Sequence, residues 1–364
     1  MIPLSIPHLA GNELKYVTDC IETGWVSSAG SYVSKFEEMV ADWSACAHGI
    51  AVSNGTLGLH LALHMLGLNP GDEVIVPNIT FIASANAVAY TNATPVFIDV
   101  DPDTWQMDLN LLKQYLDESP HTVKAIMPVH VLGNMCDMDH LIRISEEYNI
   151  PIIEDTTEAL GSKYNGKPAG SFGLMNVFSF NGNKIITTGG GGVIVTNNEA
   201  YAKRAKHLST QSKVDPETYY HDEIGFNYRL VNVLAAIGVA QMEQLPDFIE
   251  KKKYIDAYYR EQLNNVGDIK FQKVESSVDP NCWLFTFYSS KQSEILSALK
   301  QADIIARPFW FPMNQLPMFK RNIYINRTDN SKEIHNYCLS IPSSTQLKRE
   351  EQDEVISLIK SIFE

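Results

Sequence analysis

The alternation of short apolar runs with amphipathic stretches, from about residue 50 to residue 200, constrains the fold most. Alternation on this scale is typical of parallel α/β architecture, in which helices connect neighbouring strands of one sheet. A helix is expected from Asn12 to Thr23, with Asn12 as its cap, Gly24 as its stop and Leu14, Val17 and Ile21 on one face. The predicted strands are residues 74–76, 96–98, 125–127, 152–153, 177–180 and 193–195.

The pattern changes after about residue 246 to a smaller α+β arrangement. A helical pattern ends at Leu245, where Pro246 marks a break or a kink. We therefore expect a large domain over residues 1–246 and a small C-terminal domain over residues 247–364. The other predicted helices are 33–43, 138–148, 231–245, 248–263, 293–301 and 350–363, with strands at 284–288 and near 304–305.

Composition excludes several classes of protein. The 364 residues are 45% hydrophobic and 20% charged, as in soluble globular proteins. The net charge is −14 and no basic cluster exceeds residues 251–253, which argues against a nucleic-acid partner. Five scattered cysteines without C-x-x-C spacing predict reduced thiols and no metal site. With no signal-like N-terminus and no apolar run of roughly 20 residues, we expect a cytoplasmic protein without a membrane partner.

Lys184 is the strongest candidate for chemistry. It lies within F-S-F-N-G-N-K-I-I-T-T-G-G-G-G, residues 178–192, between apolar strands and small residues. Desolvation in such a place lowers the pKa of a lysine and frees its amine as a nucleophile, as a Schiff-base lysine requires. Asp155 ends the preceding apolar run, where a carboxylate suits the pyridinium nitrogen of pyridoxal 5'-phosphate (PLP). A nicotinamide site is the rival interpretation, but the glycines lead into a strand and not into a helix.

These motifs, spread from residues 6–8 to residues 341–344, resemble the DegT/DnrJ/StrS family of PLP-dependent aminotransferases, which act on nucleotide-linked keto-sugars. The resemblance implies a fold-type I α/β architecture, with a large, mostly parallel sheet domain that binds PLP and a smaller C-terminal α+β domain. It also implies a homodimer with shared active sites.

The resemblance gives roles to residues that have simpler interpretations. Gly55 and Thr56 precede an apolar helix and could belong to an ordinary N-cap, Phe81 could be a core residue, and Glu158 a solvated first-turn acid. In the family, Lys184 would carry the cofactor and move a proton, and Asp155 would pair with the ring nitrogen. The other cofactor-binding residues implied are Gly55, Thr56 and Ser179 at the phosphate, Phe81 on the ring face, Glu158 near the ring oxygen, and Asn227 at the phosphate of the partner subunit.

Substrate contacts are implied by three further segments. Trp25 belongs to G-W-V-S-S, Arg229 to G-F-N-Y-R-L, and Arg307 and Asn314 to R-P-F-W-F-P-M-N. Arg229 could serve an anionic group or fasten the dimer interface. Many family members have histidine in place of Asn314 and glutamate in place of Gly190, which places these sugar contacts in question.

The resemblance implies transfer of the amine of L-glutamate to the C4 ketone of a nucleotide-linked 4-keto-6-deoxy sugar, for surface polysaccharide, lipopolysaccharide O-antigen or glycan synthesis. UDP-linked 4-keto-6-deoxy-N-acetylglucosamine is the leading substrate; a GDP-perosamine synthase or a dTDP-sugar aminotransferase is the alternative. A PLP sugar dehydratase would have histidine in place of Lys184 or iron-sulfur cysteines. A regulatory protein that binds PLP without turnover is a third possibility, against which the set of Asp155, Ser179 and Lys184 argues.

Overall fold

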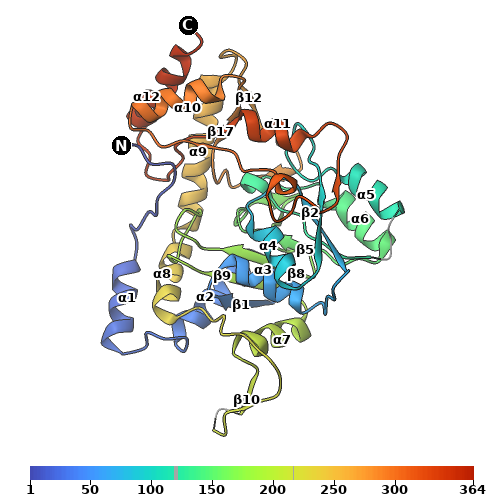
Figure 1. Ribbon diagram of the computed structural model, residues 1–364. Helices are drawn as coiled ribbons and strands as arrows, with labels where there is room; N and C mark the ends of the chain where they lie inside the picture. The colour runs from blue at the N-terminus through green and yellow to red at the C-terminus, as the bar shows by residue number, and fades with distance from the viewer. Residues whose placement is uncertain (119–121, 216) are drawn as a thin grey trace.

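The computed structural model describes residues 1–118, 122–215 and 217–364 (Figure 1). Its centre is one continuous sheet layer made of two four-stranded sheets, in the orders β1-β9-β8-β5 and β4-β2-β3-β16. Isolated parallel bridges from Ile126 to Ile152 and from Val129 to Asp155 join the two. Only β9 runs antiparallel to its neighbours within these sheets. The strands are β1 (His48–Val52), β2 (Glu73–Pro77), β3 (Thr94–Ile98), β4 (Val123–Ile126), β5 (Ile153–Asp155), β8 (Met175–Ser179), β9 (Gly192–Thr196) and β16 (Tyr324–Ile325).

Helices cover both faces of this layer, which explains why its strands are largely apolar. In β2, Val74 and Val76 pack on one face and Ile75 on the other, because successive side chains of a strand point in opposite directions. All six strands predicted from the sequence before residue 200 lie in this layer, so the α/β prediction is confirmed. The covering helices are α2 (Ser31–Trp43), α3 (Gly55–His64), α4 (Ala83–Tyr90), α5 (Leu109–Glu118), α6 (Met138–Tyr148), α7 (Glu199–Ser209) and α8 (Asn232–Met242).

The C-terminal part has its own antiparallel sheet, in the order β12-β14-β17-β15, and its own core. Ile2 belongs to that core and forms a bridge with Ile304, so the N-terminal end of the chain packs with the C-terminal part. The elements are α9 (Leu245–Leu263), β12 (Lys270–Phe271), β14 (Thr286–Tyr288), α10 (Gln292–Gln301), β15 (Arg307–Pro308), α11 (Asn330–Tyr337), β17 (Cys338–Ser340) and α12 (Arg349–Ser361).

Pro246 lies in the first turn of α9, where a missing backbone N–H is tolerated, and it therefore starts a helix instead of kinking one. The division at residue 246 stays a prediction, because β16 pairs with β3, and β13 (Val278–Asp279) pairs with β6 (Lys163–Tyr164). The remaining short elements are β7 (Lys167–Pro168), β10 (Lys213–Asp215), β11 (Tyr220–His221), η1 (Val131–Gly133) and η2 (Met313–Gln315).

Helix α1 (Glu13–Glu22) differs from expectation in the face that it buries. Leu14 is 80% exposed and Ile21 is 65% exposed, whereas Glu13 and Cys20 are buried. Glu13 is buried because its carboxylate accepts hydrogen bonds from the side chains of Gln241, in the last turn of α8, and Gln244, just after it. The apolar stripe of α1 is therefore uncovered in the single chain. None of the helices in the described ranges is long and apolar enough to cross a membrane.

Candidate active site

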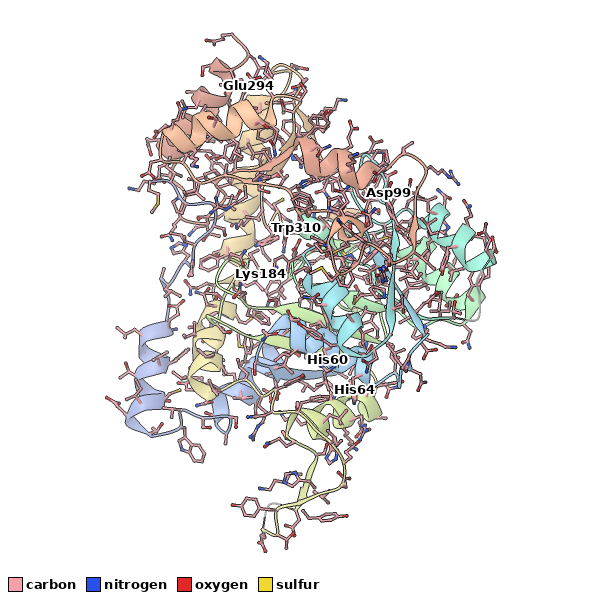
Figure 2. The ribbon with its side chains drawn as sticks, viewed as in Figure 1. His60, His64, Asp99, Lys184, Glu294 and Trp310 are labelled. Carbon is pink, nitrogen blue, oxygen red and sulfur yellow. The ribbon has the colours of Figure 1, made fainter. Side chains whose placement is uncertain are left out.

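A cavity of about 600 Å³ lies between the large sheet and the C-terminal part, and Lys184 lines it. Figure 2 shows Lys184 and Trp310, another lining residue, near the middle of the molecule. We call it the Lys184 cavity. Of the residues expected at the site, it brings together Gly55, Thr56, Phe81, Glu158, Ser179, Lys184 and Arg307.

Lys184 lies in the loop between β8 and β9, where its backbone N–H closes a turn onto the carbonyl of Asn181. Its Nζ is 3.7 Å from Oε1 of Glu158. Burial lowers the pKa of Lys184, while the carboxylates of Glu158 and Asp155 oppose that change. A lowered pKa increases the neutral fraction of the amine, which is the nucleophilic form.

Glu158 is buried beside Lys184 and is held by the backbone of η1. The N–H of Leu132 donates to its Oε2 at 2.9 Å. Burial raises the pKa of Glu158 to about 7, although the charge of Lys184 acts in the opposite direction. Glu158 and Lys184 are therefore two titratable groups whose protonation is coupled across 3.7 Å, an arrangement that suits proton transfer.

Asp155 ends β5 and is 2% exposed. Its Oδ2 accepts a 2.7 Å hydrogen bond from Oγ of Ser84, and its Oδ1 accepts one of 3.1 Å from the N–H of Thr157. These two donors fix the orientation of the carboxylate. The neighbouring residues Thr157 and Glu158 line the Lys184 cavity. A buried, oriented carboxylate at this place fits the requirement of a pyridinium nitrogen.

The turn from β1 into α3 provides an anion-binding arrangement. Asn54 caps α3, since its side chain accepts from the N–H of Leu57 at 2.9 Å. A Cβ built on Gly55 would lie 2.9 Å from Cβ of Ser179 and 3.1 Å from Cγ2 of Thr157, so only glycine allows the helix start to approach these residues so closely. The hydroxyls of Thr56, Thr157 and Ser179 and the free N–H groups of the helix start therefore converge, as phosphate binding requires. The residues present fit PLP.

Five of the residues expected to contact substrate or cofactor do not line the cavity of the single chain, namely Asp155, described above, and the four that follow. Trp25 is 58% exposed. Asn227 is exposed and forms an isolated bridge with Thr210, and Arg229 forms one with Val52. Asn314 exchanges two hydrogen bonds, of 3.0 and 2.9 Å, with Asn78 after β2. The roles expected of these four residues stay predictions, as do the roles of the residues that line the cavity.

Sequence analysis missed three residues that contact the expected ones: Ser84, Leu132 and Trp283. Ser84 lies in the apolar helix α4, three positions after Phe81. Its closeness in sequence to Phe81 is the one feature of the sequence that points to the site. The indole of Trp283 packs against Lys184, with Nζ 4.1 Å from the ring centroid. Nothing in the local sequence of Trp283 indicates this contact, because it depends on how the C-terminal part packs on the sheet.

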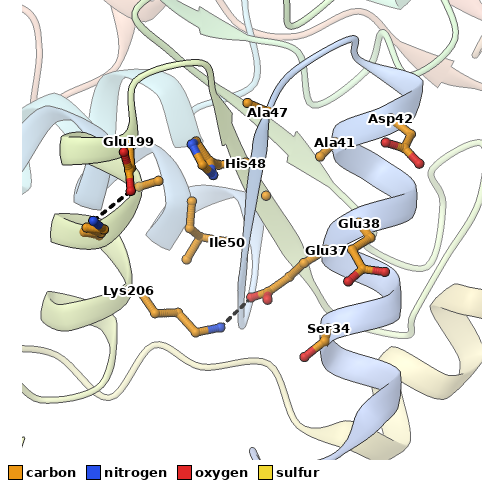
Figure 3. Close-up of a pocket in the computed structure, with 13 residues that line it drawn as sticks. Ser34, Glu37, Glu38, Ala41, Asp42, Ala47, His48, Ile50, Glu199 and Lys206 are labelled. Atoms are coloured by element: carbon orange, nitrogen blue, oxygen red, sulfur yellow. Dashed lines mark hydrogen bonds and ion pairs between the residues drawn. The ribbon is translucent and has the colours of Figure 1, made fainter.

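A larger hollow of about 660 Å³ lies between α2, β1 and α7 (Figure 3). None of the residues expected at the active site line it. Glu37 pairs there with Lys206, and Glu199 pairs with Lys203. The hollow is open, and two of its carboxylates are paired with lysines. Surface ion pairs of this kind are common and contribute little to stability. We assign the chemistry to the smaller Lys184 cavity.

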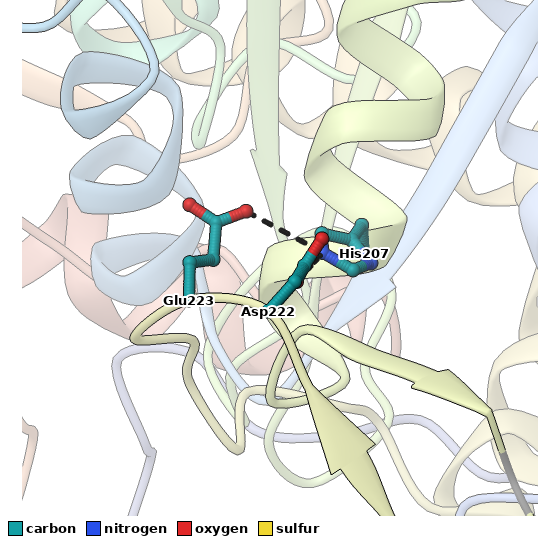
Figure 4. Close-up of side chains that lie close together, drawn as sticks. All are labelled: His207, Asp222 and Glu223. Atoms are coloured by element: carbon teal, nitrogen blue, oxygen red, sulfur yellow. Dashed lines mark hydrogen bonds and ion pairs between the residues drawn. The ribbon is translucent and has the colours of Figure 1, made fainter.

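Within the described residues, one group has the geometry to hold a metal ion, namely His207, Asp222 and Glu223 (Figure 4). His207 Nε2 is 2.8 Å from Oδ1 of Asp222 and 3.4 Å from Oε1 of Glu223. Arg204 already forms an ion pair with Glu223 through both terminal nitrogens of its guanidinium group. A cation in this position would have to compete with that guanidinium, so we assign no metal to it.

Comparison with known proteins identifies the family. Residues 7–360 match the model of the DegT/DnrJ/EryC1/StrS aminotransferase family. GDP-perosamine synthase of Escherichia coli O157:H7 is 39% identical over 366 residues, covering 100% of this chain and 98% of that protein.

Solved structures agree as well. A DegT DnrJ EryC1 StrS aminotransferase from Brucella abortus has a TM-score of 0.91 at 26% identity, covering 97% of this chain and 95% of that one. Spr1654 from Streptococcus pneumoniae, solved in a PLP form, has a TM-score of 0.92 at 25% identity, covering 99% and 98%. The chain belongs to the DegT/DnrJ/EryC1/StrS aminotransferase family and is a PLP-dependent sugar aminotransferase.

Proposed function

We propose that this protein transfers the amine of L-glutamate to the C4 ketone of a nucleotide-linked 4-keto-6-deoxy sugar. The observation that carries the proposal is the Lys184 amine, on a side chain that is 12% exposed, 3.7 Å from Glu158 in a cavity of about 600 Å³. That volume is in the range typical of small-molecule sites. PLP, when bound, supplies an electron sink for the carbon that loses its proton.

Different residues at the cavity would bind the cofactor and transfer the proton. Gly55, Thr56 and Ser179 would hold the phosphate, and Asp155 would keep the pyridine nitrogen protonated. Phe81 would cover one face of the ring, and its 56% exposed side chain is free to do so. The Nζ of Lys184 would remove the proton from the α carbon of the amino donor in the first half-reaction, and would deliver a proton to the sugar carbon that receives the amine in the second.

Arg307 and Trp310 define the substrate side of the cavity. Arg307 is exposed. Among the described residues, its guanidinium donates a hydrogen bond to the carbonyl of Ala306. A guanidinium with free donors suits a carboxylate or a diphosphate. We assign it to the anionic group of the amino donor or of the nucleotide.

Two nucleotides compete for the substrate role. The sequence motifs favour UDP-linked 4-keto-6-deoxy-N-acetylglucosamine, whereas three relatives, at 36–39% identity over the full chain, are GDP-perosamine synthases. We place the GDP-linked substrate first because the relatives cover the whole chain and the motifs cover only parts of it. A dTDP-linked sugar is the further alternative.

We also propose that two chains build each active site. Asn227 is exposed and lies outside the cavity of its own chain, as a residue that serves the phosphate of a partner would. Apolar side chains that a dimer could cover are exposed nearby in the sequence: Tyr219 is 74% exposed and Ile224 is 88% exposed. Tyr219 directly precedes β11 and Ile224 follows it, in the β10–β11 hairpin region that projects from the molecule in Figure 1.

The decisive experiment for the substrate is a panel assay. Purified protein with PLP and L-glutamate is incubated with GDP-, UDP- and dTDP-linked 4-keto-6-deoxy sugars, and aminated products are detected by mass spectrometry. We expect one nucleotide to support rapid formation of a 4-amino sugar together with an equal amount of 2-oxoglutarate. Amination of none of them would refute the proposed substrate class.

A further inference from the structure

Trp283 is a residue outside the expected set that packs against the amine of Lys184. Its ring centroid is 4.1 Å from Nζ of Lys184, and it is 3% exposed. It also lines the Lys184 cavity. A cation above the face of an indole is attracted by the electron density of the ring, most strongly where water is excluded.

Trp283 is held by three hydrogen bonds, one from its indole and two at its backbone. Its Nε1 donates to the carbonyl of Asn183, the residue before Lys184, at 2.7 Å. Its backbone N–H donates to Oδ1 of Asn281 at 3.0 Å. Its carbonyl accepts from Nζ of Lys252 at 2.7 Å. The ring therefore cannot move away from Lys184 without breaking one of these bonds.

Asn281 links the indole to the other side of the amine. Its Nδ2 donates to the carbonyls of Glu158 and Leu160, at 2.8 and 3.0 Å. The backbones of Trp283 and Glu158 are thus held by one side chain. The amine of Lys184 lies between an aromatic face and a carboxylate whose positions are coupled.

We propose that Trp283 is a positioning residue that stabilises the protonated, unattached amine of Lys184 and thereby sets the pH range in which this amine can take up PLP. The inference rests on the proposed role of Lys184. It adds the indole face as a second group, beside Glu158, that stabilises the charged form of Lys184. Both groups oppose the effect of burial, which favours the neutral amine. The other charged groups near Lys184 are Asp155 and, in the same cavity, Arg307.

The test measures covalent uptake of PLP by the cofactor-free protein between pH 6 and about 10. The uptake rate follows the neutral fraction of Lys184. Trp283→Leu removes the aromatic face, so we expect the midpoint of the rate profile to move to lower pH by about one unit, a tenfold change in the protonation equilibrium. Trp283→Phe keeps a ring face and should remain closer to the wild type.

Trp105→Leu is the matched control. Trp105 is 4% exposed and belongs to the same apolar cluster as Trp283, where it packs on Phe309. Its loss should lower stability by a comparable amount and leave the midpoint unchanged. An unchanged midpoint in Trp283→Leu, or an equal change in Trp105→Leu, would overturn the inference.

A second measurement avoids substitutions that disturb folding. Replacing the tryptophans of the wild-type chain with fluorinated analogues weakens the ring face while keeping its shape. The midpoint should fall stepwise with the number of fluorine atoms, and a constant midpoint would overturn the inference. If Lys184→Ala still attaches PLP covalently, the proposed function fails; if Lys184 is the attachment point but fluorination has no effect, this inference alone fails.

Discussion

Oγ of Ser84 donates a 2.7 Å hydrogen bond to Oδ2 of Asp155, and both residues are buried. Ser84→Ala should therefore lower kcat by roughly 10- to 100-fold, the range expected for a hydrogen bond to a charged group. The fold should be intact by circular dichroism. Asp155→Asn should be more severe, because an unprotonated pyridine is a poor electron sink. Near-normal turnover of Asp155→Asn would show that another residue pairs with the ring nitrogen.

Glu158 should give the cofactor-free protein a distinctive pH dependence of stability. Burial raises its pKa to about 7 from an ordinary value of 4.5. Between these values the folded state binds more protons than the unfolded state, so this group makes the free energy of unfolding fall as the pH rises from 4.5 to 7.

The comparison is with Glu158→Gln, which cannot ionise. Urea titrations at several pH values should show that the variant lacks the decrease, on the order of 3 kcal/mol at most, that the wild type has in this window. Parallel pH dependences of the two proteins would contradict the assignment.

Lys252 should make the free energy of unfolding rise with pH, the opposite of the effect of Glu158, and at higher pH. Its Nζ donates to the carbonyls of Trp283 and Ser343, and burial lowers its pKa from 10.5 to about 7. Between pH 7 and 10.5 the unfolded state binds more protons, so this group makes stability increase with pH. Lys252→Met should abolish an increase on the order of a few kcal/mol. Lys251→Met, at an exposed neighbouring position, is the control and should keep the wild-type slope.

Shared active sites predict complementation between two inactive variants. Lys184→Ala lacks the amine, and Asn227→Asp places a carboxylate where it would repel the phosphate of PLP. A mixed dimer of the two would hold one site with both wild-type residues, so co-refolding should restore part of the activity. Sedimentation should first show a dimer or larger assembly. A fully active monomer, or mixtures that stay inactive, would contradict the shared site.

The sequence predicted six of the eight strands of the sheet layer, because these strands are largely buried on both faces and largely apolar, whereas β1 and β16 are only partly buried and were not predicted. It predicted the cavity residues carried by local motifs, such as Lys184 and Ser179. It did not predict Trp283 or Ser84, whose contacts depend on packing between distant segments. It also misassigned the buried face of α1, since Glu13 is buried through hydrogen bonds to glutamines and the apolar side chains Leu14 and Ile21 are exposed.

The most direct test of the account is a spectroscopic comparison of wild-type protein and Lys184→Ala during the two half-reactions. PLP-loaded wild type should have a visible absorbance band that disappears with L-glutamate and returns when the nucleotide-linked keto-sugar is added. Lys184→Ala should lack that band and catalyse neither change, whereas Lys167→Ala, a substitution of an exposed lysine in β7, should behave as wild type. A Lys184→Ala variant that keeps the band and completes both half-reactions would contradict the assignment of Lys184 as the residue that carries the cofactor and moves the proton.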